Sequence, residues 1–150
     1  MSKICVFFGH RDCSLSEEEM KILQNTIVEL ILNHNVCDFW VGGMGNFDKI
    51  TSQMIRNLKT NFPHIKLHLA LAYIPTNKEN YEYQEKIFDR VFCPQGIESG
   101  PPKFAICRRN KEMVLNADFL ICYVKQKFGG AYQAMQIAKR NNKTFFNICE

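Results

Sequence analysis

The chain has 150 residues, 46% hydrophobic and 23% charged, which suits one domain around one buried core. Its net charge of +4 is mild, and nucleic-acid binding usually requires a strongly basic face. No apolar run approaches the roughly 18 residues that span a bilayer, and the short apolar run near Met1 does not fit a secretory signal. We therefore expect a single domain over residues 1–150, located in the cytoplasm, with no membrane partner.

The seven cysteines are expected to be reduced. Their number is odd, no pair has CxxC spacing, and most lie in apolar runs, as small hydrophobic thiols do in a reducing compartment. The four histidines show no metal-ligand spacing with these cysteines, so we expect no metal site. No cofactor is expected either.

The first half of the chain alternates between apolar strands and amphipathic helices. Strands are expected at Lys3–Phe8, Cys37–Val41 and Ile65–Tyr73. Ser16 and Glu19 fit a capping box at the start of the first helix, which closes at Asn33 to Asn35. The second helix carries an apolar face at helical spacing, made of Phe47, Ile50, Met54 and Leu58.

The second half is more irregular before it returns to the same alternation. Pro75–Glu85 is polar and charged, so an exposed loop is expected there, followed by a weak strand at Arg90–Cys93. The turn-rich loop Gln95–Pro102 ends in two prolines that can start a helix, which runs to about Asn116. The last expected elements are a strand at Asp118–Val124, a helix opened by Gly129-Gly130, and a strand at Thr144–Ile148.

Strands that are apolar throughout and separated by amphipathic helices indicate a parallel sheet with both faces covered. The sequence therefore predicts an α/β fold: one doubly wound, mainly parallel, Rossmann-like sheet with helices on both faces. In such sheets ligands bind beyond the carboxyl ends of the strands, near the switch in strand order. Residues that directly follow the strands are therefore the site candidates.

Three strand ends carry glycine. Gly9-His10-Arg11 follows the first strand, Gly42-Gly43-x-Gly45-Asn46 follows the second, and Gly129-Gly130 opens the last helix. Glycine lets the backbone approach a ligand, and the free N–H groups at a helix start favour an anion. Tight strand–helix packing also selects glycine, and a solvated polar loop explains His10 and Arg11 equally well. We expect the second and third of these turns to hold phosphate.

The helix after the two prolines places Arg109 and Asn110 toward its apolar face, whereas Arg108 points roughly the opposite way. A charge that is buried needs partners, because an unpaired one is costly. The partner is either a core carboxylate, Asp48 or Asp118, or the phosphate or ribose of a ligand. We favour the ligand, because this helix packs beside the strand that leads into the last glycine turn.

Three further residues are candidates for the same site. Asp48, in the first turn of the second helix, either caps that helix or binds ligand hydroxyl groups. Glu98 is either a solvated loop residue or a ligand-contacting carboxylate, and Tyr73 either stacks on a base or packs. If the protein is catalytic, the candidate catalytic residues are Glu98, Asp48 and Arg109.

These motifs together resemble the SLOG superfamily, the Rossmann-like group that includes the cytokinin-activating LOG enzymes and the DNA-processing protein DprA. The resemblance covers nearly the whole chain and is closest to the small YpsA-like branch of bacterial and phage proteins. The segments that carry it are Phe8-Gly9-His10-Arg11, Gly42-Gly43-x-Gly45-x-Phe47-Asp48, Arg109-Asn110-x-x-Met113, Ala117-Asp118 and Gly129-Gly130.

The resemblance implies a nucleotide ligand more firmly than it implies hydrolysis. LOG enzymes cleave the N-glycosidic bond of a nucleoside monophosphate with an arginine and the glutamate of a PGGxGTxxE signature. Arg109 and Asp118 keep the nine-residue spacing of the LOG arginine and aspartate, but no proline precedes Gly129 and Tyr132-Gln133-Ala134-Met135 supplies no glutamate. The resemblance also implies a homo-oligomer.

We therefore expect a protein that senses or sequesters a nucleotide-type small molecule, such as an ADP-ribose-like or cyclic nucleotide. Its phosphates are expected on the glycine-turn amides, with Arg11 and Arg109 neutralising their charge. One alternative is a LOG-like nucleoside-5′-monophosphate phosphoribohydrolase with a relocated carboxylate. The other is DprA-like single-stranded DNA binding, which the mild net charge makes the least favoured, so nucleic acid is not the expected partner.

Overall fold

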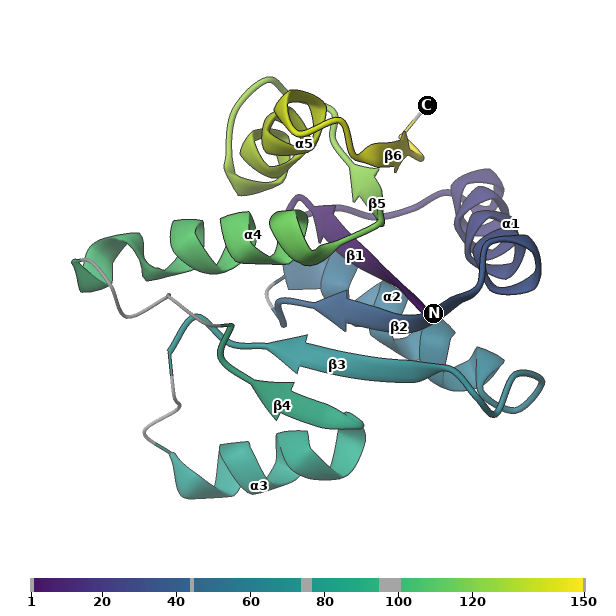
Figure 1. Ribbon diagram of the computed structural model, residues 1–150, viewed down its shortest axis with the longest axis horizontal. Coiled ribbons are helices and arrows are strands. Elements are labelled where there is room, and N and C mark those ends of the chain that lie inside the picture. Colours follow the sequence, from purple (N-terminus) through teal and green to yellow (C-terminus); the bar gives the residue numbers. More distant parts are fainter. Residues whose placement is uncertain (1, 44, 74–76, 95–100, 150) are drawn as a thin grey trace.

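Six parallel strands form one sheet in the computed structural model, which describes residues 2–43, 45–73, 77–94 and 101–149. The strand order is β4-β3-β2-β1-β5-β6 (Figure 1), and all neighbouring pairs are parallel. The strands are β1 (Lys3–Gly9), β2 (Val36–Val41), β3 (Lys66–Ala70), β4 (Arg90–Phe92), β5 (Phe119–Tyr123) and β6 (Thr144–Asn147). The predicted α/β, doubly wound fold is confirmed.

Helices cover both faces of this sheet. They are α1 (Glu17–Asn33), α2 (Gly45–Leu58), α3 (Lys78–Ile87), α4 (Ala105–Asn116), which follows a short 3₁₀ turn at Pro102–Phe104, and α5 (Gly130–Arg140). Apolar residues of α1 and α2 form one core with the sheet and those of α4 and α5 form the other, and α2 and α4 lie on opposite sides of the strands (Figure 1). Across the described ranges, no helix combines the length and apolar character needed to cross a bilayer.

The β1 strand shows why its sequence is apolar without alternation. Successive side chains of a strand point to opposite faces, so Cys5 and Phe7 enter the core with α1 and α2, while Val6 and Phe8 enter the core with α4 and α5. The predicted capping box then starts α1. Ser16 Oγ accepts the Glu19 N–H at 3.1 Å, and the Glu19 carboxylate accepts the Ser16 N–H at 3.0 Å.

Two predicted elements differ from the structure. The predicted loop at Pro75–Glu85 is wrong from residue 78 onward, because α3 occupies Lys78–Ile87. None of its residues is fully buried, and its partly buried side chains, Tyr81, Gln84 and Ile87, include only two apolar ones among many polar residues. The Asn77 side chain, which accepts two backbone N–H groups, caps its start. The strand predicted over Ile65–Tyr73 is shorter and ends at Ala70.

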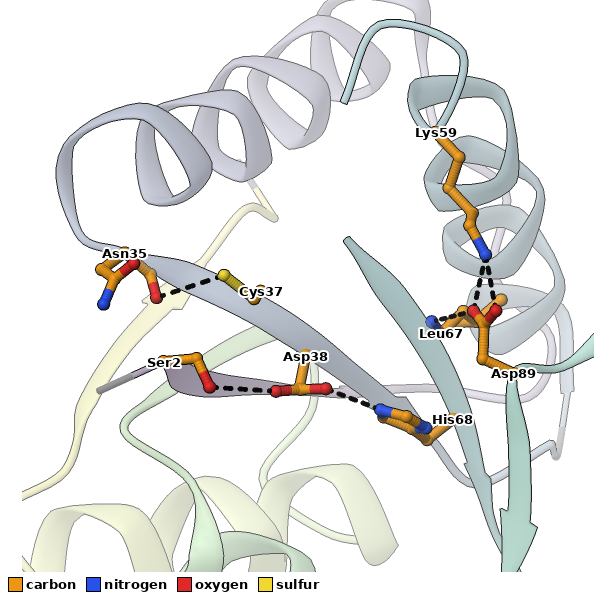
Figure 2. A network of polar contacts seen from close by, with 8 residues as sticks. All are labelled: Ser2, Asn35, Cys37, Asp38, Lys59, Leu67, His68 and Asp89. Carbon is orange, nitrogen blue, oxygen red and sulfur yellow. Dashed lines mark hydrogen bonds and ion pairs between the residues drawn. The ribbon is translucent and has the colours of Figure 1, made fainter. Parts of the chain in front are cut away.

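Polar contacts connect neighbouring elements near the amino-terminal ends of the strands (Figure 2). Lys59, which directly follows α2, donates to both carboxylate oxygens of Asp89 at 2.6 and 2.8 Å, and the same carboxylate accepts the Leu67 N–H at 2.7 Å. Burial alone raises the pKa of Asp89, but the hydrogen bonds from Lys59 and Leu67 outweigh it and hold the pKa below its usual value. The ionised Asp89 therefore ties α2, β3 and β4 together.

Replacing Asp89 with asparagine is expected to lower the free energy of unfolding by about 1–2 kcal/mol, because the pair with Lys59 is partly screened by solvent. Since the folded state lowers the pKa of Asp89 below 3.8, its stabilisation is present above that pH and is lost as the pH falls through the folded-state pKa. Urea denaturation near neutral pH and near about pH 3 measures both effects. Glu82→Gln in the exposed Lys78–Glu82 pair is the control and should change little.

Candidate functional site

A cavity of about 700 Å³ lies at the carboxyl ends of β1, β2 and β5. The strand order switches at β1, which has β2 on one side and β5 on the other, so the cavity occupies the position where such sheets bind ligands. Its polar and glycine lining includes Gly9, His10, Arg11, Asp12, Ser14, Gly42, Asp48, Arg109, Asn110, Tyr123, Lys125, Gln126, Gly129, Gly130 and Gln133.

Gly9, the last residue of β1, is a packing position, and His10, which follows it, connects the ends of β1 and β5. A Cβ atom on Gly9 would lie 2.3 Å from Cγ of Phe47. The His10 N–H donates to the Tyr123 carbonyl at 3.4 Å, and its Nε2 accepts the Lys125 N–H at 2.9 Å. Burial lowers the pKa of His10 below its usual value, and the Lys125 charge adds to this effect. His10 is therefore neutral near pH 7.

The glycine turn after β2 is closed by protein atoms. Gly43 and Gly45 have φ angles of 74° and 85°, and a Cβ atom on them would lie 2.7 Å from Leu69 Cδ1 and 2.6 Å from Arg11 Cα, respectively. The Asn46 N–H donates to the Arg11 carbonyl at 2.9 Å. The start of α2 is thus packed against the loop after β1. Of residues 42, 43, 45 and 46, Gly42 lines the cavity.

Arg109 and Asn110 point inward from α4, as the helical spacing predicts. Their exposed fractions are 4% and 8%. Arg109 Nε donates to Asn110 Oδ1 at 2.9 Å, and Nη1 donates to the carbonyls of Gly42 at 2.9 Å and Ala70 at 3.2 Å. These three acceptors are neutral, and together they attach α4 to the ends of β2 and β3.

The charge of Arg109 remains in place despite this burial. Burial lowers the pKa of its guanidinium, the carboxylate of Asp48 opposes that shift, and an arginine stays protonated under such conditions. Asp118, the other carboxylate predicted as a partner, accepts the Ile4 N–H at 2.9 Å instead. The acceptors of Arg109 are therefore carbonyl and amide oxygens rather than Asp118.

Two donors of this pair face the cavity. Among the described residues, no atom accepts a hydrogen bond from Nη2 of Arg109 or from Nδ2 of Asn110, and both residues line the cavity. A Cβ atom on Gly130 would lie 3.5 Å from Asn110 Nδ2, so the amide group lies beside the first residue of α5. Within the described part of the chain, neither atom is a fully buried atom without a partner, so both are open to the cavity and can donate to an acceptor there.

The turn before α5 is open, unlike the turn before α2. Gly129 has a φ angle of 94°, and a Cβ atom built on it would meet no atom within 4 Å. No side chain caps the 11-residue helix that follows. A free helix N-terminus carries partial positive charge. We call this N-terminus, together with Arg109 Nη2 and Asn110 Nδ2, the anion seat.

The remaining predicted site residues are placed differently from one another. Asp48 is 7% exposed and lines the cavity from the first turn of α2. Tyr73 is 59% exposed and is not part of the cavity lining. Glu98 lies outside the described residues. Within the ranges that are described, no three His, Cys, Asp or Glu side chains are arranged to hold a metal ion.

Sequence reasoning missed several lining residues, chiefly Ser14, Tyr123, Lys125, Gln126 and Gln133. Tyr123 lies opposite Gly9 in the parallel register of β1 and β5, and its hydroxyl group donates to Glu19 at 3.2 Å. Burial is the main cause that raises the pKa of this phenol. The available signal was a polar aromatic residue at the carboxyl end of an apolar strand.

Comparison with solved structures finds the same fold in several proteins. DNA processing protein A from Streptococcus pneumoniae matches 97% of this chain over 50% of its own, with 18% identity and a TM-score of 0.66. The corresponding Helicobacter pylori protein, whose structure was described for its single-stranded DNA binding mode, matches 97% of this chain over 65% of its own, with 15% identity and a TM-score of 0.62. A structural genomics target, TM1055, matches 95% over 72%, with 14% identity and a TM-score of 0.57.

The chain therefore spans about half of the first of these proteins, and the similarity is one of fold. No protein-family model and no curated protein sequence matches the chain significantly. The predicted likeness to the DprA-like, Rossmann-type group is confirmed at the level of the fold. The assignment to the YpsA-like branch stays a prediction.

Proposed function

We propose that this protein binds a nucleotide or nucleotide-derived small molecule, with a phosphate group in the anion seat. The observation that carries this proposal is the convergence of Arg109 Nη2, Asn110 Nδ2 and the uncapped N-terminus of α5 on one cavity. A phosphate offers oxygen acceptors to all of these donors, and its charge offsets that of the buried guanidinium.

The rest of the cavity suits the remainder of a nucleotide. Its volume of about 700 Å³ far exceeds that of a phosphate and lies within the usual size of small-molecule sites. The Asp48 carboxylate can accept ribose hydroxyl groups, while Arg11 and Lys125 supply exposed positive charge. In this proposal the phosphate lies at α5 rather than at Gly42–Asn46, where the Asn46 N–H already donates to Arg11.

Binding without turnover is the main proposal, and hydrolysis of an N-glycosidic bond is its alternative. Gln133 lines the cavity from the first turn of α5, and its segment, residues 132–135, contains no glutamate. Of the two candidate carboxylates, Asp48 is buried and lines the same cavity, while Glu98 lies outside the described residues. An oxocarbenium-like transition state needs such a negative charge close to the ribose.

Single-stranded DNA is the second candidate ligand, on the evidence of exposed aromatic side chains beside the cavity. Phe104 is 49% and Phe128 66% exposed, and each lies within two residues of a residue in the lining. Lys103 lies over the Phe104 ring at 5.1 Å. Exposed aromatic rings with nearby cations are what sequence-independent strand binding uses, and the Helicobacter pylori protein of the same fold binds single-stranded DNA.

Calorimetric titration with adenosine 5′-monophosphate, ADP-ribose and 3′,5′-cyclic AMP tests the proposal directly. We expect saturable binding of at least one of them, and competition by inorganic phosphate, because both anions would occupy one seat. Chromatography of the same mixtures detects free base, which would support the hydrolase alternative. Mass spectrometry of small molecules released from the denatured protein identifies a ligand retained from the cell.

An oligonucleotide titration by fluorescence anisotropy separates the second candidate. Strand binding should weaken steeply with salt, because phosphate contacts release counterions. If the oligonucleotide binds and none of the three nucleotides does, the small-molecule proposal is wrong. We also propose that the protein is cytoplasmic and self-associates. Light scattering of the purified chain measures its self-association.

A further inference from the structure

The segment between β5 and α5 carries one side of the anion seat, and few contacts hold it. Residues 125 to 130 are all exposed. The segment is fixed where it leaves β5. There, Asn147 Oδ1 accepts the Val124 N–H at 3.0 Å, Asn147 Nδ2 donates to the Val124 carbonyl at 3.0 Å, and His10 contacts the next residue, Lys125.

The hydrogen bond between His10 and Lys125 determines which nitrogen of the His10 ring carries the proton. Because the Lys125 N–H donates to Nε2 at 2.9 Å, Nε2 must carry a lone pair, so the proton of a neutral imidazole is on Nδ1. The imidazolium ion has no lone pair on either nitrogen. Protonation therefore replaces this hydrogen bond with two donors facing each other, beside the positive charge of Lys125.

The charged groups around His10 come from several elements. Burial is the main cause that lowers the pKa of His10, and Lys125, which follows β5, is the charged group that adds to this effect. Arg11 and Asp12 follow it on its own loop, and Asp48 of α2 and Arg109 of α4 line the same cavity.

We propose that His10 is a positioning residue for the anion seat: its neutral ring holds Lys125, and through it the Gly129–Gly130 turn, in the geometry that binds phosphate. This inference rests on the proposed function. It predicts the direction in which anion binding changes with pH. A cationic His10 that simply attracted the ligand would strengthen anion binding at acid pH, whereas loss of the Lys125 contact weakens it.

The ligand-free protein provides the first test. Nitrogen-15 NMR of the histidine rings should show His10 with its proton on Nδ1 near about pH 7.5. On acidification, amide hydrogen exchange at Lys125 should accelerate as His10 protonates, while exchange in β1 stays slow. A proton on Nε2, or an unchanged Lys125 exchange rate through the His10 titration, would overturn the inference without reference to any ligand.

Ligand binding provides the second test, with adenosine 5′-monophosphate as the probe. His10→Gln keeps an acceptor for the Lys125 N–H but does not titrate, and His10→Lys mimics the protonated ring. His64→Gln alters an exposed histidine outside the cavity and is the matched control. The phosphate of the nucleotide itself titrates at about pH 6. The affinity of each protein for the nucleotide is therefore compared with that of His10→Gln at the same pH.

At about pH 7.5, the wild-type protein should bind the nucleotide as tightly as His10→Gln does. At about pH 5, its affinity should be about tenfold lower than that of His10→Gln, which corresponds to the loss of one hydrogen bond. His10→Lys should bind weakly at both pH values, and His64→Gln should follow the wild type. A wild-type affinity that rises above that of His10→Gln at acid pH contradicts the inference. If no variant binds adenosine 5′-monophosphate at any pH, this nucleotide is not the ligand, and the hydrogen-exchange result alone decides the role of His10.

Discussion

Arg109→Ala is expected to weaken nucleotide binding roughly 10- to 100-fold, because a charge-assisted hydrogen bond contributes about 1.5–3 kcal/mol and each 1.4 kcal/mol is a factor of ten. The side chain is 4% exposed, whereas the other cations of the cavity lining, Arg11 and Lys125, are exposed. Calorimetric titration of the wild type and the variant with the same nucleotide measures the change. Arg108→Ala is the matched control, since Arg108 lies outside the cavity lining.

Arg109 also holds the fold together, so the two roles must be separated. Its Nη1 donates to Gly42 and Ala70, and its loss is expected to lower the free energy of unfolding by about 2–3 kcal/mol. Arg109→Lys keeps the charge and can reach one carbonyl, but it loses the fork that presents Nη2 to the cavity. It should therefore be more stable than Arg109→Ala and still bind poorly.

Binding and stability data together decide the role of Arg109. If Arg109→Ala is folded and binds as tightly as Arg108→Ala, the guanidinium serves the fold alone. Gly42→Ala gives an independent measurement, because its Cβ atom would lie 2.9 Å from Arg109 Cζ and displace the guanidinium without removing it. Weaker binding in this variant, with most of the stability retained, would support a role in the ligand site.

Helical periodicity explains why the Arg109-Asn110 pair could be predicted from the sequence. Ile106, Asn110, Met113 and Val114 recur at helical spacing, and Arg109 lies at the edge of that face. The structure buries both polar residues there. Helical periodicity could not predict the hydrogen-bond acceptors of Arg109, because the carbonyls of Gly42 and Ala70 come near it only when β2 and β3 are assembled.

The two glycine turns show a limit of sequence reasoning. Both follow a strand and open a helix, so both predict a phosphate cradle. Whether a glycine is open or closed depends on what lies opposite its missing side chain. Leu69 and Arg11 lie against Gly43 and Gly45, whereas nothing lies within 4 Å of a Cβ atom at Gly129. These neighbours are remote in the chain, and no local pattern encodes them.

Register explains the lining residues that sequence reasoning missed. Tyr123 belongs to an apolar strand whose other residues are core, and its position in the cavity follows from its pairing with Gly9. The helix α3 was missed because its sequence is mostly polar and its partly buried positions Tyr81, Gln84 and Ile87 supply only two apolar side chains. Local signals therefore predicted the fold class and the inward pair, whereas the neighbours of each glycine required the assembled sheet.

Gly9→Ala is expected to destabilise the fold by about 3 kcal/mol or more, at the upper end of the cost of overpacking a core. The added Cβ atom would lie 2.3 Å from Cγ and 2.4 Å from Cβ of Phe47. Because the Cβ position of Phe47 is fixed by its own backbone, no change of rotamer relieves the second contact. Either β1 or α2 must move, and Phe47 is fully buried against Phe7 and Tyr123.

Gly130→Ala is the matched control, because it adds the same methyl group at another glycine of the cavity lining. Its Cβ atom would meet Asn110 Nδ2 at 3.5 Å, an ordinary contact, and alanine at the start of a helix restricts the unfolded chain. Chemical denaturation should therefore show a large loss for Gly9→Ala and little change for Gly130→Ala. Similar losses for both would mean that Gly9 is not a packing position. A small loss for Gly9→Ala alone would mean that α2 can shift, and the closed turn before it could then open toward a ligand.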